Sequence, residues 1–411
     1  LVALAALAAT SAFAQSSVEL YGVADIGYNV VTSRSDKNGT VKQVGIGAGG
    51  NSGNGSGNLQ GGRFGLRGTE DLGNGLKAGF LMEYGVNFTG AGSDSAATNS
   101  GAPAAASENA QGAGLALMRQ GGINLSSATL GKVTVGTQYA FHDATSGALA
   151  GASATGGTNN VVGASNLLKY GYTGGQPRLA NAISYVTPTI SGVTLRAMRN
   201  QGKAVQDSNY TLQAANAMNA NSFAADYAQG PLQFGIAQTK YSNVYAALPT
   251  LVAGNAGMTT LIDLVGQKND QVGNTAFAVG TADITNRVAG GTYDFGKAKV
   301  GLNRGTYEAN FAASATRGIK STQTLASLAV PVSANATVMT GYTTGTIAQG
   351  GTDAYKTKAI DLIGVYNLSK RTNVYALWVQ TKYDSQAASI TPGTNDSAKQ
   401  SQYSVGVRHS F

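Results

Sequence analysis

Apolar and polar residues alternate along most of this chain, and this period of two is the feature that most limits its fold. At the C-terminus, Tyr403, Val405, Val407, His409 and Phe411 are separated from one another by single serine, glycine and arginine residues. A helix would scatter the two sets around its circumference, whereas a strand places them on opposite faces. Similar segments recur from residue 17 onward, so we predict an all-β protein.

The connections between these segments alternate between short turns and long loops. The short ones contain the Gly, Pro, Asn, Asp or Ser that tight turns require. They lie at 71–75, 127–131, 187–189, 229–231, 294–297, 331–335 and 368–371. The long, polar ones lie at roughly 32–59, 90–114, 140–177, 201–219, 242–281, 309–318, 346–356 and 384–399. Seven short turns and eight long loops separate 16 strands.

The low charge of the chain decides between two architectures for 16 such strands. A soluble sandwich hides its apolar face and needs a charged exterior, but charged residues are only 12% of this sequence. A membrane barrel turns its apolar face to lipid and, being closed, leaves no unpaired strand edge. We therefore predict a 16-stranded antiparallel transmembrane β-barrel with short periplasmic turns and long extracellular loops. A barrel of this size encloses a water-filled lumen.

The first residues indicate export. Residues 1–9 read LVALAALAA, and Ala12-Phe13-Ala14 forms a small-x-small cleavage site. We expect residues 1–14 to be a signal peptide whose charged n-region precedes Leu1, and residues 15–411 to be the barrel. No later stretch offers the roughly 18 consecutive apolar residues that a membrane helix needs.

Composition also limits the ligands. The chain has no Cys and only two His, at positions 142 and 409, which excludes thiolate and His-rich metal centres. We expect no cofactor and no bound metal. No basic run resembles a nucleic-acid-binding arm, so we expect no nucleic-acid partner. The formal net charge of +8 suits anionic small molecules or an anionic surface.

Four motifs in order resemble the general porins of Gram-negative bacteria, particularly the β-proteobacterial type. They are residues 17–28, the RFGLRGTEDLGNGLKA hairpin at 63–78, YNLSKRT at 366–372 with Tyr375, and VGVRHSF at 405–411. The resemblance implies a homotrimer in the bacterial outer membrane, in contact with its lipid. It also implies a diffusion channel for small hydrophilic solutes and anions, whose third loop folds inward to form a constriction. The C-terminal Phe411 resembles the signal that the barrel-assembly machinery reads.

In this family, inward basic residues face acidic groups on the third loop. By motif, Arg63, Arg67 and Arg119 match the basic positions. Strand parity independently supports Arg63 and Arg67, because both share a face opposite Phe64 and Leu66.

A fourth arginine is expected on the fifth strand, after Gly136, but Thr137 stands there. Because Thr137 has the parity of Val133 and Val135, it faces inward only if Gly136 forms a β-bulge.

The predicted third loop, 140–177, departs further from the family, because Asp143 is its only carboxylate. The constriction residues that we predict are Arg63, Arg67, Arg119, Glu83 and Asp143. With little acid opposite the arginines, we expect a mild anion preference.

Alternatives remain open at this point. The arginines could chiefly brace the wall by pairing with the inward carboxylates Glu19, Asp25 and Glu83. We predict that the protein is not an enzyme. A barrel hydrolase, which would need a Ser–His pair at the barrel surface, and an adhesin that uses the long loops are the alternatives to a pore.

Overall fold

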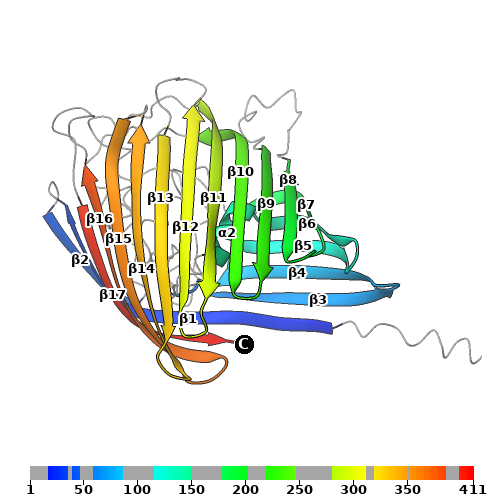
Figure 1. The fold of residues 1–411 in the computed structure, drawn as a ribbon, viewed down its shortest axis with the longest axis horizontal. Helices are drawn as coiled ribbons and strands as arrows, with labels where there is room; N and C mark the ends of the chain where they lie inside the picture. Colours follow the sequence, from blue (N-terminus) through cyan, green and yellow to red (C-terminus); the bar gives the residue numbers. More distant parts are fainter. Residues whose placement is uncertain are drawn as a thin grey trace, which may run out of the picture.

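The computed structural model describes residues 17–35, 39–46, 59–86, 115–149, 178–201, 219–246, 280–311, 319–349, 352–385 and 398–411. Its strands form one antiparallel barrel (Figure 1). The predicted signal peptide, residues 1–14, lies outside the described residues. Among the helices that the structure describes, none is long and apolar enough to cross a membrane.

The strands run in chain order around the barrel. Their bounds are β1 Ser17–Ser35, β2 Gly39–Ile46, β3 Arg63–Gly73, β4 Leu76–Val86, β5 Leu115–Ser127, β6 Gly131–Tyr139, β7 Arg178–Val186, β8 Val193–Asn200, β9 Asn219–Gln229, β10 Leu232–Ala246, β11 Gly280–Asp294, β12 Lys299–Phe311, β13 Ile319–Pro331, β14 Ala336–Gln349, β15 Thr352–Asn367, β16 Thr372–Ser385 and β17 Ala398–Ser410. The one helix described is α2, Phe141–Leu149.

Strand β1 closes the ring by pairing with two strands. Its first part pairs with β3, with Glu19 opposite Arg67, and its second part pairs with β17, with Tyr28 opposite Val405. Sixteen of the 17 strands make up this closed ring, which confirms the predicted fold. Closure satisfies the backbone groups that an open edge would leave unpaired in lipid.

The additional strand, β2, is a correction to the sequence prediction, which placed a long loop at 32–59. Residues 39–46 pair with the end of β1, so that Val44 lies opposite Val30 and Ile46 opposite Tyr28. Although the segment contains glycines, its apolar residues still recur at every second position. This alternation lets it form a hairpin with β1 and extend the apolar face of that strand.

The two faces of the barrel wall have the polarity that lipid requires. On β17, Tyr403, Val405 and Val407 are exposed, whereas Gln402 and Ser404, which alternate with them, are buried on the lumen side. The exposed face of the wall is therefore apolar, which is the reverse of a soluble sandwich.

The short turns fold through local hydrogen bonds that their sequences supply. Asp71 and Asp294 each accept a hydrogen bond from the backbone N–H two residues later, at 2.9 and 2.8 Å. The hydroxyl of Ser369 accepts one from Arg371 N–H, at 3.1 Å. Such Asx and Ser/Thr turns form without help from the rest of the fold, so the turns were readable from the sequence.

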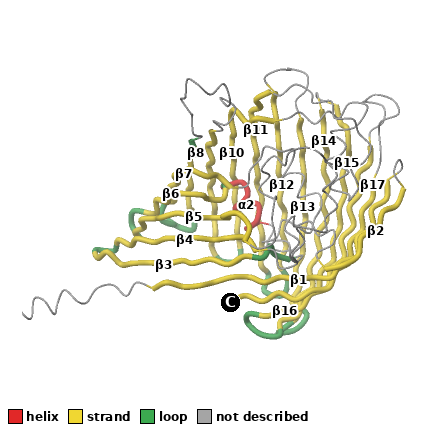
Figure 2. Tube along the Cα trace, turned by 180° about the vertical axis from the view of Figure 1, so that it is seen from behind, coloured by secondary structure: helices red, strands yellow, loops and turns green. Residues whose placement is uncertain are grey.

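Helix α2 begins directly after β6 and lies inside the barrel, against β9 to β12 (Figures 1 and 2). It forms the first part of the predicted third loop, and its position confirms that this part of the loop folds inward. The remainder of that loop, 150–177, lies outside the described residues.

Candidate functional site

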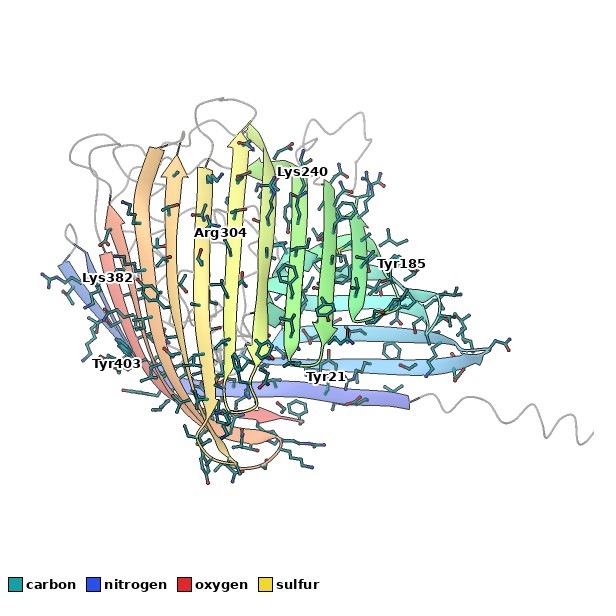
Figure 3. All side chains as sticks on the ribbon, in the orientation of Figure 1. Tyr21, Tyr185, Lys240, Arg304, Lys382 and Tyr403 are labelled. Atoms are coloured by element: carbon teal, nitrogen blue, oxygen red, sulfur yellow. The ribbon has the colours of Figure 1, made fainter. Side chains whose placement is uncertain are left out.

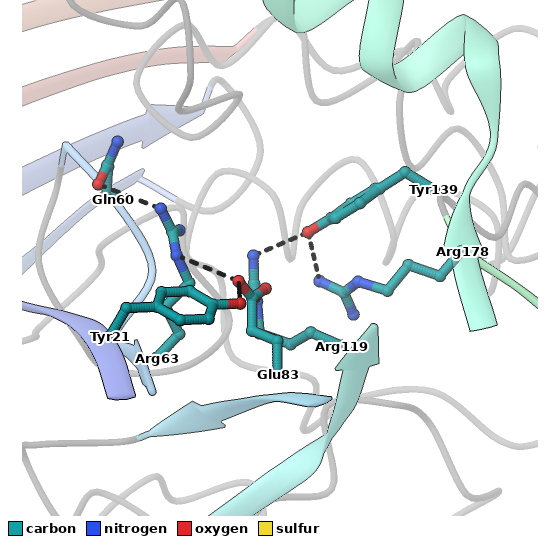
Figure 4. Close-up of polar contacts among 7 residues, drawn as sticks. All are labelled: Tyr21, Gln60, Arg63, Glu83, Arg119, Tyr139 and Arg178. Carbon is teal, nitrogen blue, oxygen red and sulfur yellow. Dashed lines mark hydrogen bonds and ion pairs between the residues drawn. The ribbon is translucent and has the colours of Figure 1, made fainter. Parts of the chain in front are cut away.

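A buried carboxylate, Glu83 of β4, organises a cluster of cations on the lumen side of the wall (Figure 4). Its Oε1 lies 2.8 Å from Arg119 Nε, and its Oε2 lies 3.6 Å from Arg63 Nε. The Tyr21 hydroxyl donates a hydrogen bond to Oε2 at 3.0 Å. The Glu83 side chain is 7% exposed, whereas that of Arg63 is 22% exposed. The carboxylate is thus enclosed, and the guanidinium of Arg63 retains contact with the lumen.

Arg119 reaches this cluster because β5 contains a bulge. In the pairing of β4 with β5, Glu83 lies opposite Gln120 and Tyr84 lies opposite Met118, so Arg119 is the extra residue. If the strand alternated strictly, Arg119 would face outward, as Ile123 does. The motif located this arginine, and parity alone could not have done so.

A second bulge, at Gly136 of β6, brings Tyr139 into the cluster. Gly136 has φ +139°, and the pairing with β7 shifts register between Gly136 and Gln138. The Tyr139 hydroxyl accepts hydrogen bonds from Arg119 at 2.7 Å and from Arg178 at 3.3 Å. The β-bulge at Gly136 on which the orientation of Thr137 depends is therefore present. Tyr139 was not predicted as a site residue. A bulge at Gly136, which would turn Thr137 inward, was the signal in the sequence that could have indicated it.

Arg67 lies apart from the Glu83 cluster. It faces Glu19 across the pairing of β1 with β3 and binds it with two hydrogen bonds, Nε to Oε2 at 2.8 Å and Nη2 to Oε1 at 2.9 Å. Both side chains are more than half exposed. The guanidinium also lies 5.0 Å from the centre of the Tyr21 ring. Because Glu19 neutralises it, Arg67 adds little net charge to the lumen.

Asp143 lies on a different element from the arginines of the cluster. It is buried in the first turn of α2, which packs against β9 to β12, whereas the Glu83 cluster is built on β3 to β7. The structure therefore brings together three of the five predicted constriction residues, Arg63, Arg119 and Glu83, and adds Arg178.

Helix α2 is held to the wall by an arginine of β8. Arg196 Nε lies 2.6 Å from Asp226 Oδ2, and its Nη2 donates a hydrogen bond to Thr145 at 2.6 Å. Its guanidinium stacks 4.8 Å from the centre of the Phe141 ring. These contacts fix the start of the inward loop to the barrel.

The buried His142 is a second attachment point of α2. Its Nδ1 lies 2.9 Å from Thr239 Oγ1, and its Nε2 lies 3.2 Å from Asn286 Nδ2. The neighbouring Phe141 N–H donates to Ser222 Oγ at 2.9 Å. These partners lie on β9, β10 and β11, so the start of the helix is connected to three strands.

Asp25 of β1 connects the residues just before β3 to β16. Its Oδ2 accepts hydrogen bonds from Leu59 N–H at 3.0 Å and from Gln60 N–H at 2.6 Å, and its Oδ1 accepts one from Tyr375 at 2.7 Å. Gln60 in turn accepts a hydrogen bond from Arg63, at 3.4 Å. Asp25 therefore braces the wall beside the cluster.

Comparisons with known proteins agree with this architecture. A family model described as Gram-negative porin matches residues 1–386. Outer membrane porin protein 32 of Delftia acidovorans is 49% identical over 84 residues, which are 20% of this chain and 21% of that protein. An outer membrane porin protein of Bordetella pertussis is 26% identical over 98% of this chain and 96% of its own. Among solved structures, an anion-selective porin from Comamonas acidovorans has a TM-score of 0.64 at 23% identity, covering 97% of this chain and 100% of its own. The trimer form of OmpT from Vibrio cholerae has a TM-score of 0.57 at 13% identity, covering 96% and 99%.

Proposed function

We propose a solute preference for this chain, which belongs to the Gram-negative porin family and so forms an outer-membrane diffusion channel. Its lumen passes small hydrophilic solutes with a mild preference for anions. The observation that carries this proposal is the cluster in which Arg63 and Arg119 pair with the carboxylate of Glu83, while the Tyr139 hydroxyl links Arg119 to Arg178. Among the described residues, the guanidinium groups of Arg63 and Arg119 share the carboxylate of Glu83, so these three side chains together carry a net charge of +1 on one side of the lumen.

The physical basis is the field that such a cluster produces in a narrow aqueous path. Low-dielectric walls focus the field and raise the local concentration of counter-ions, so anions are enriched beside the arginines. The preference is mild because Glu83 offsets one of the two charges of Arg63 and Arg119, and Glu19 pairs with Arg67. The description of the Comamonas acidovorans porin as anion-selective supports the same sign.

Removing cluster arginines tests this proposal. Replacement of Arg63 and Arg119 by Gln should move the reversal potential in a salt gradient toward cation preference. The same change at Arg287 and Arg304, which are exposed on the outer face, is the matched control and should leave it unchanged. Both variants should first be shown to fold by their mobility on unheated gels. An unchanged reversal potential in the folded cluster variant would mean that these arginines only brace the wall.

We also propose that the channel is a homotrimer without catalytic activity. The structural likeness to the trimer form of OmpT supports the oligomeric state. On unheated detergent gels the protein should migrate as a trimer and, after boiling, as a monomer slightly smaller than the 41.5 kDa of all 411 residues, because the signal peptide is removed. A monomer by light scattering in mild detergent would contradict the trimer.

A further inference from the structure

A short segment directly before β3, residues 59–62, is tied to the wall at both of its ends. The N–H groups of Leu59 and Gln60 donate hydrogen bonds to Asp25 at 3.0 and 2.6 Å. At the other end, the carbonyl oxygen of Gly62 accepts a hydrogen bond from Val86 N–H at 2.9 Å. The backbone of the segment is therefore held between β1 and the end of β4. We call residues 59–62 the crossing segment.

The side chain of Leu59 shows that the crossing segment lies inside the barrel. It is 1% exposed and belongs to one apolar cluster with Leu377 and Val379 of β16. Between these two residues, Trp378 lies opposite Tyr403 of β17, which is exposed on the outer face (Figure 3). Leu377 and Val379 therefore face inward, and Leu59 covers them from the lumen side. Because apolar surface is unfavourable in a water-filled lumen, this contact anchors the segment there.

The middle of the crossing segment lies against the two arginines that pair with Glu83. Gln60 accepts a hydrogen bond from Arg63 Nη2 at 3.4 Å (Figure 4). The backbone at Gly61 passes close to Arg119, since a Cβ atom on this glycine would lie 3.6 Å from Arg119 Nη1. The segment thus runs from the apolar cluster on β16 to the arginine cluster.

The hydrogen bond from Arg63 fixes the orientation of the Gln60 amide. A guanidinium group only donates hydrogen bonds, so the carbonyl oxygen of the amide faces Arg63 and the NH2 group points away from it. Among the residues that the structure describes, none accepts a hydrogen bond from this NH2 group, and Gln60 is only half-buried. Gln60 therefore offers a neutral donor beside a cation.

We propose that Gln60 is a specificity-determining residue of the channel, whose NH2 group donates a hydrogen bond to anions that Arg63 attracts. Hydrogen bonds to charged acceptors are stronger than those to neutral ones, so this donor favours anions over neutral solutes of similar size. Leu59 and Asp25 are the positioning residues that hold Gln60 at the arginine cluster. This role rests on the proposed passage of anions through the lumen.

The reversal potential of single channels in a potassium chloride gradient tests the charge and the donor at this position. Q60E places a negative charge beside Arg63 and should lower the ratio of anion to cation permeability roughly threefold to fourfold. Q60M removes the amide without adding charge and should lower the ratio by no more than about twofold. The matched control is Q238E, because Gln238 accepts a hydrogen bond from Arg287 at 2.8 Å on the outer face. This control should leave the ratio unchanged.

Each variant should first be shown to fold by its mobility on unheated gels. A folded Q60E channel with an unchanged permeability ratio would overturn the proposal. An unchanged ratio in Q60M would overturn the donor role of the NH2 group. Equal losses in Q60E and Q60M would also count against the proposal, because they would show that the charge at this position has no effect of its own.

A second measurement does not depend on the anion preference. The chain has no Cys, so Q60C and the control Q238C each carry a single thiol. An anionic methanethiosulfonate reagent should modify Q60C and lower the single-channel current, whereas modification of Q238C should not change the current. Complete modification of Q60C at constant current would place residue 60 outside the solute path and overturn the proposal. An unselective unaltered channel that is still blocked through Q60C would contradict the proposed anion preference and leave residue 60 in the solute path.

The anchoring role of Leu59 is tested by coupling. L59S leaves the apolar cluster with a polar cover, so the crossing segment should lose its fixed position. Because the effects of adjacent residues are coupled, the change caused by Q60E should fall below about twofold when it is measured in the L59S background. A change of the same size in both backgrounds would show that Leu59 does not position Gln60.

Discussion

Replacing Glu83 by Gln should make the pore more selective for anions while destabilising the wall. The carboxylate accepts contacts from Arg119, Arg63 and Tyr21, and its side chain is 7% exposed. Removing one partner of a buried ion pair costs about 3–5 kcal/mol. Since the Arg63 side chain is 22% exposed to the lumen, we expect the lower end, about 3 kcal/mol, in the free energy of unfolding.

The effect on selectivity can be estimated from Coulomb's law. One unit charge acts on an ion about 6 Å away in water with about 0.7 kcal/mol, and screening at 0.1 M salt roughly halves this value. The change has opposite signs for anions and cations. Their permeability ratio should therefore rise roughly threefold to fourfold in E83Q.

The assay is the reversal potential of single channels in a planar bilayer under a potassium chloride gradient. The matched control is Glu308→Gln, which removes a carboxylate with two cationic partners from the outer face and should leave the permeability ratio unchanged. An E83Q channel with the selectivity of the unaltered protein, or with a shift toward cations, would refute the reasoning that the Glu83 cluster sets the lumen field.

Three further predictions concern assembly and the loop. Phe411 closes the seam through two backbone hydrogen bonds with Gly22, at 3.0 and 3.1 Å. Its deletion should lower the amount of protein in the outer membrane more than the loss of one aromatic contact, roughly 2–3 kcal/mol, would account for. Normal amounts on immunoblots of outer membranes would contradict this. Arg196→Gln should increase open-channel current noise because it releases α2, whereas Thr145→Val should do so less; equally quiet traces would show that α2 is held without Arg196. Gly136→Ala should lower stability to urea by at least about 1–3 kcal/mol, because its Cβ would collide with the carbonyl oxygen of Gly121; an unchanged midpoint would argue against the bulge.

The barrel was predictable from the sequence because its main determinants are local. A period of two fixes which residues face lipid, and Asp71, Asp294 and Ser369 fold their turns with their own side chains. Low charge then selected the membrane barrel. The prediction was wrong at β2, because the glycine-rich composition around residues 39–46 obscured their alternation.

The site was predictable only in part, because two bulges break the alternation there. Parity placed Arg63 correctly, but the register shifts beside Arg119 and Gly136 decide that Arg119 and Tyr139 meet in the lumen. The attachment of α2 through His142 depends on strands that lie about 100 residues or more away in the sequence. Contacts of this kind leave no pattern in a single sequence.

The central claim is that an arginine cluster in the lumen gives this channel a mild preference for anions. The most direct test is the reversal potential of the unaltered protein in a planar bilayer with a tenfold potassium chloride gradient. We expect a potential of the sign for chloride preference. This preference should weaken as salt rises from 0.1 to 1 M, since the screening length falls from about 10 Å to about 3 Å. A potential of the opposite sign, or one of zero at low salt, would contradict it.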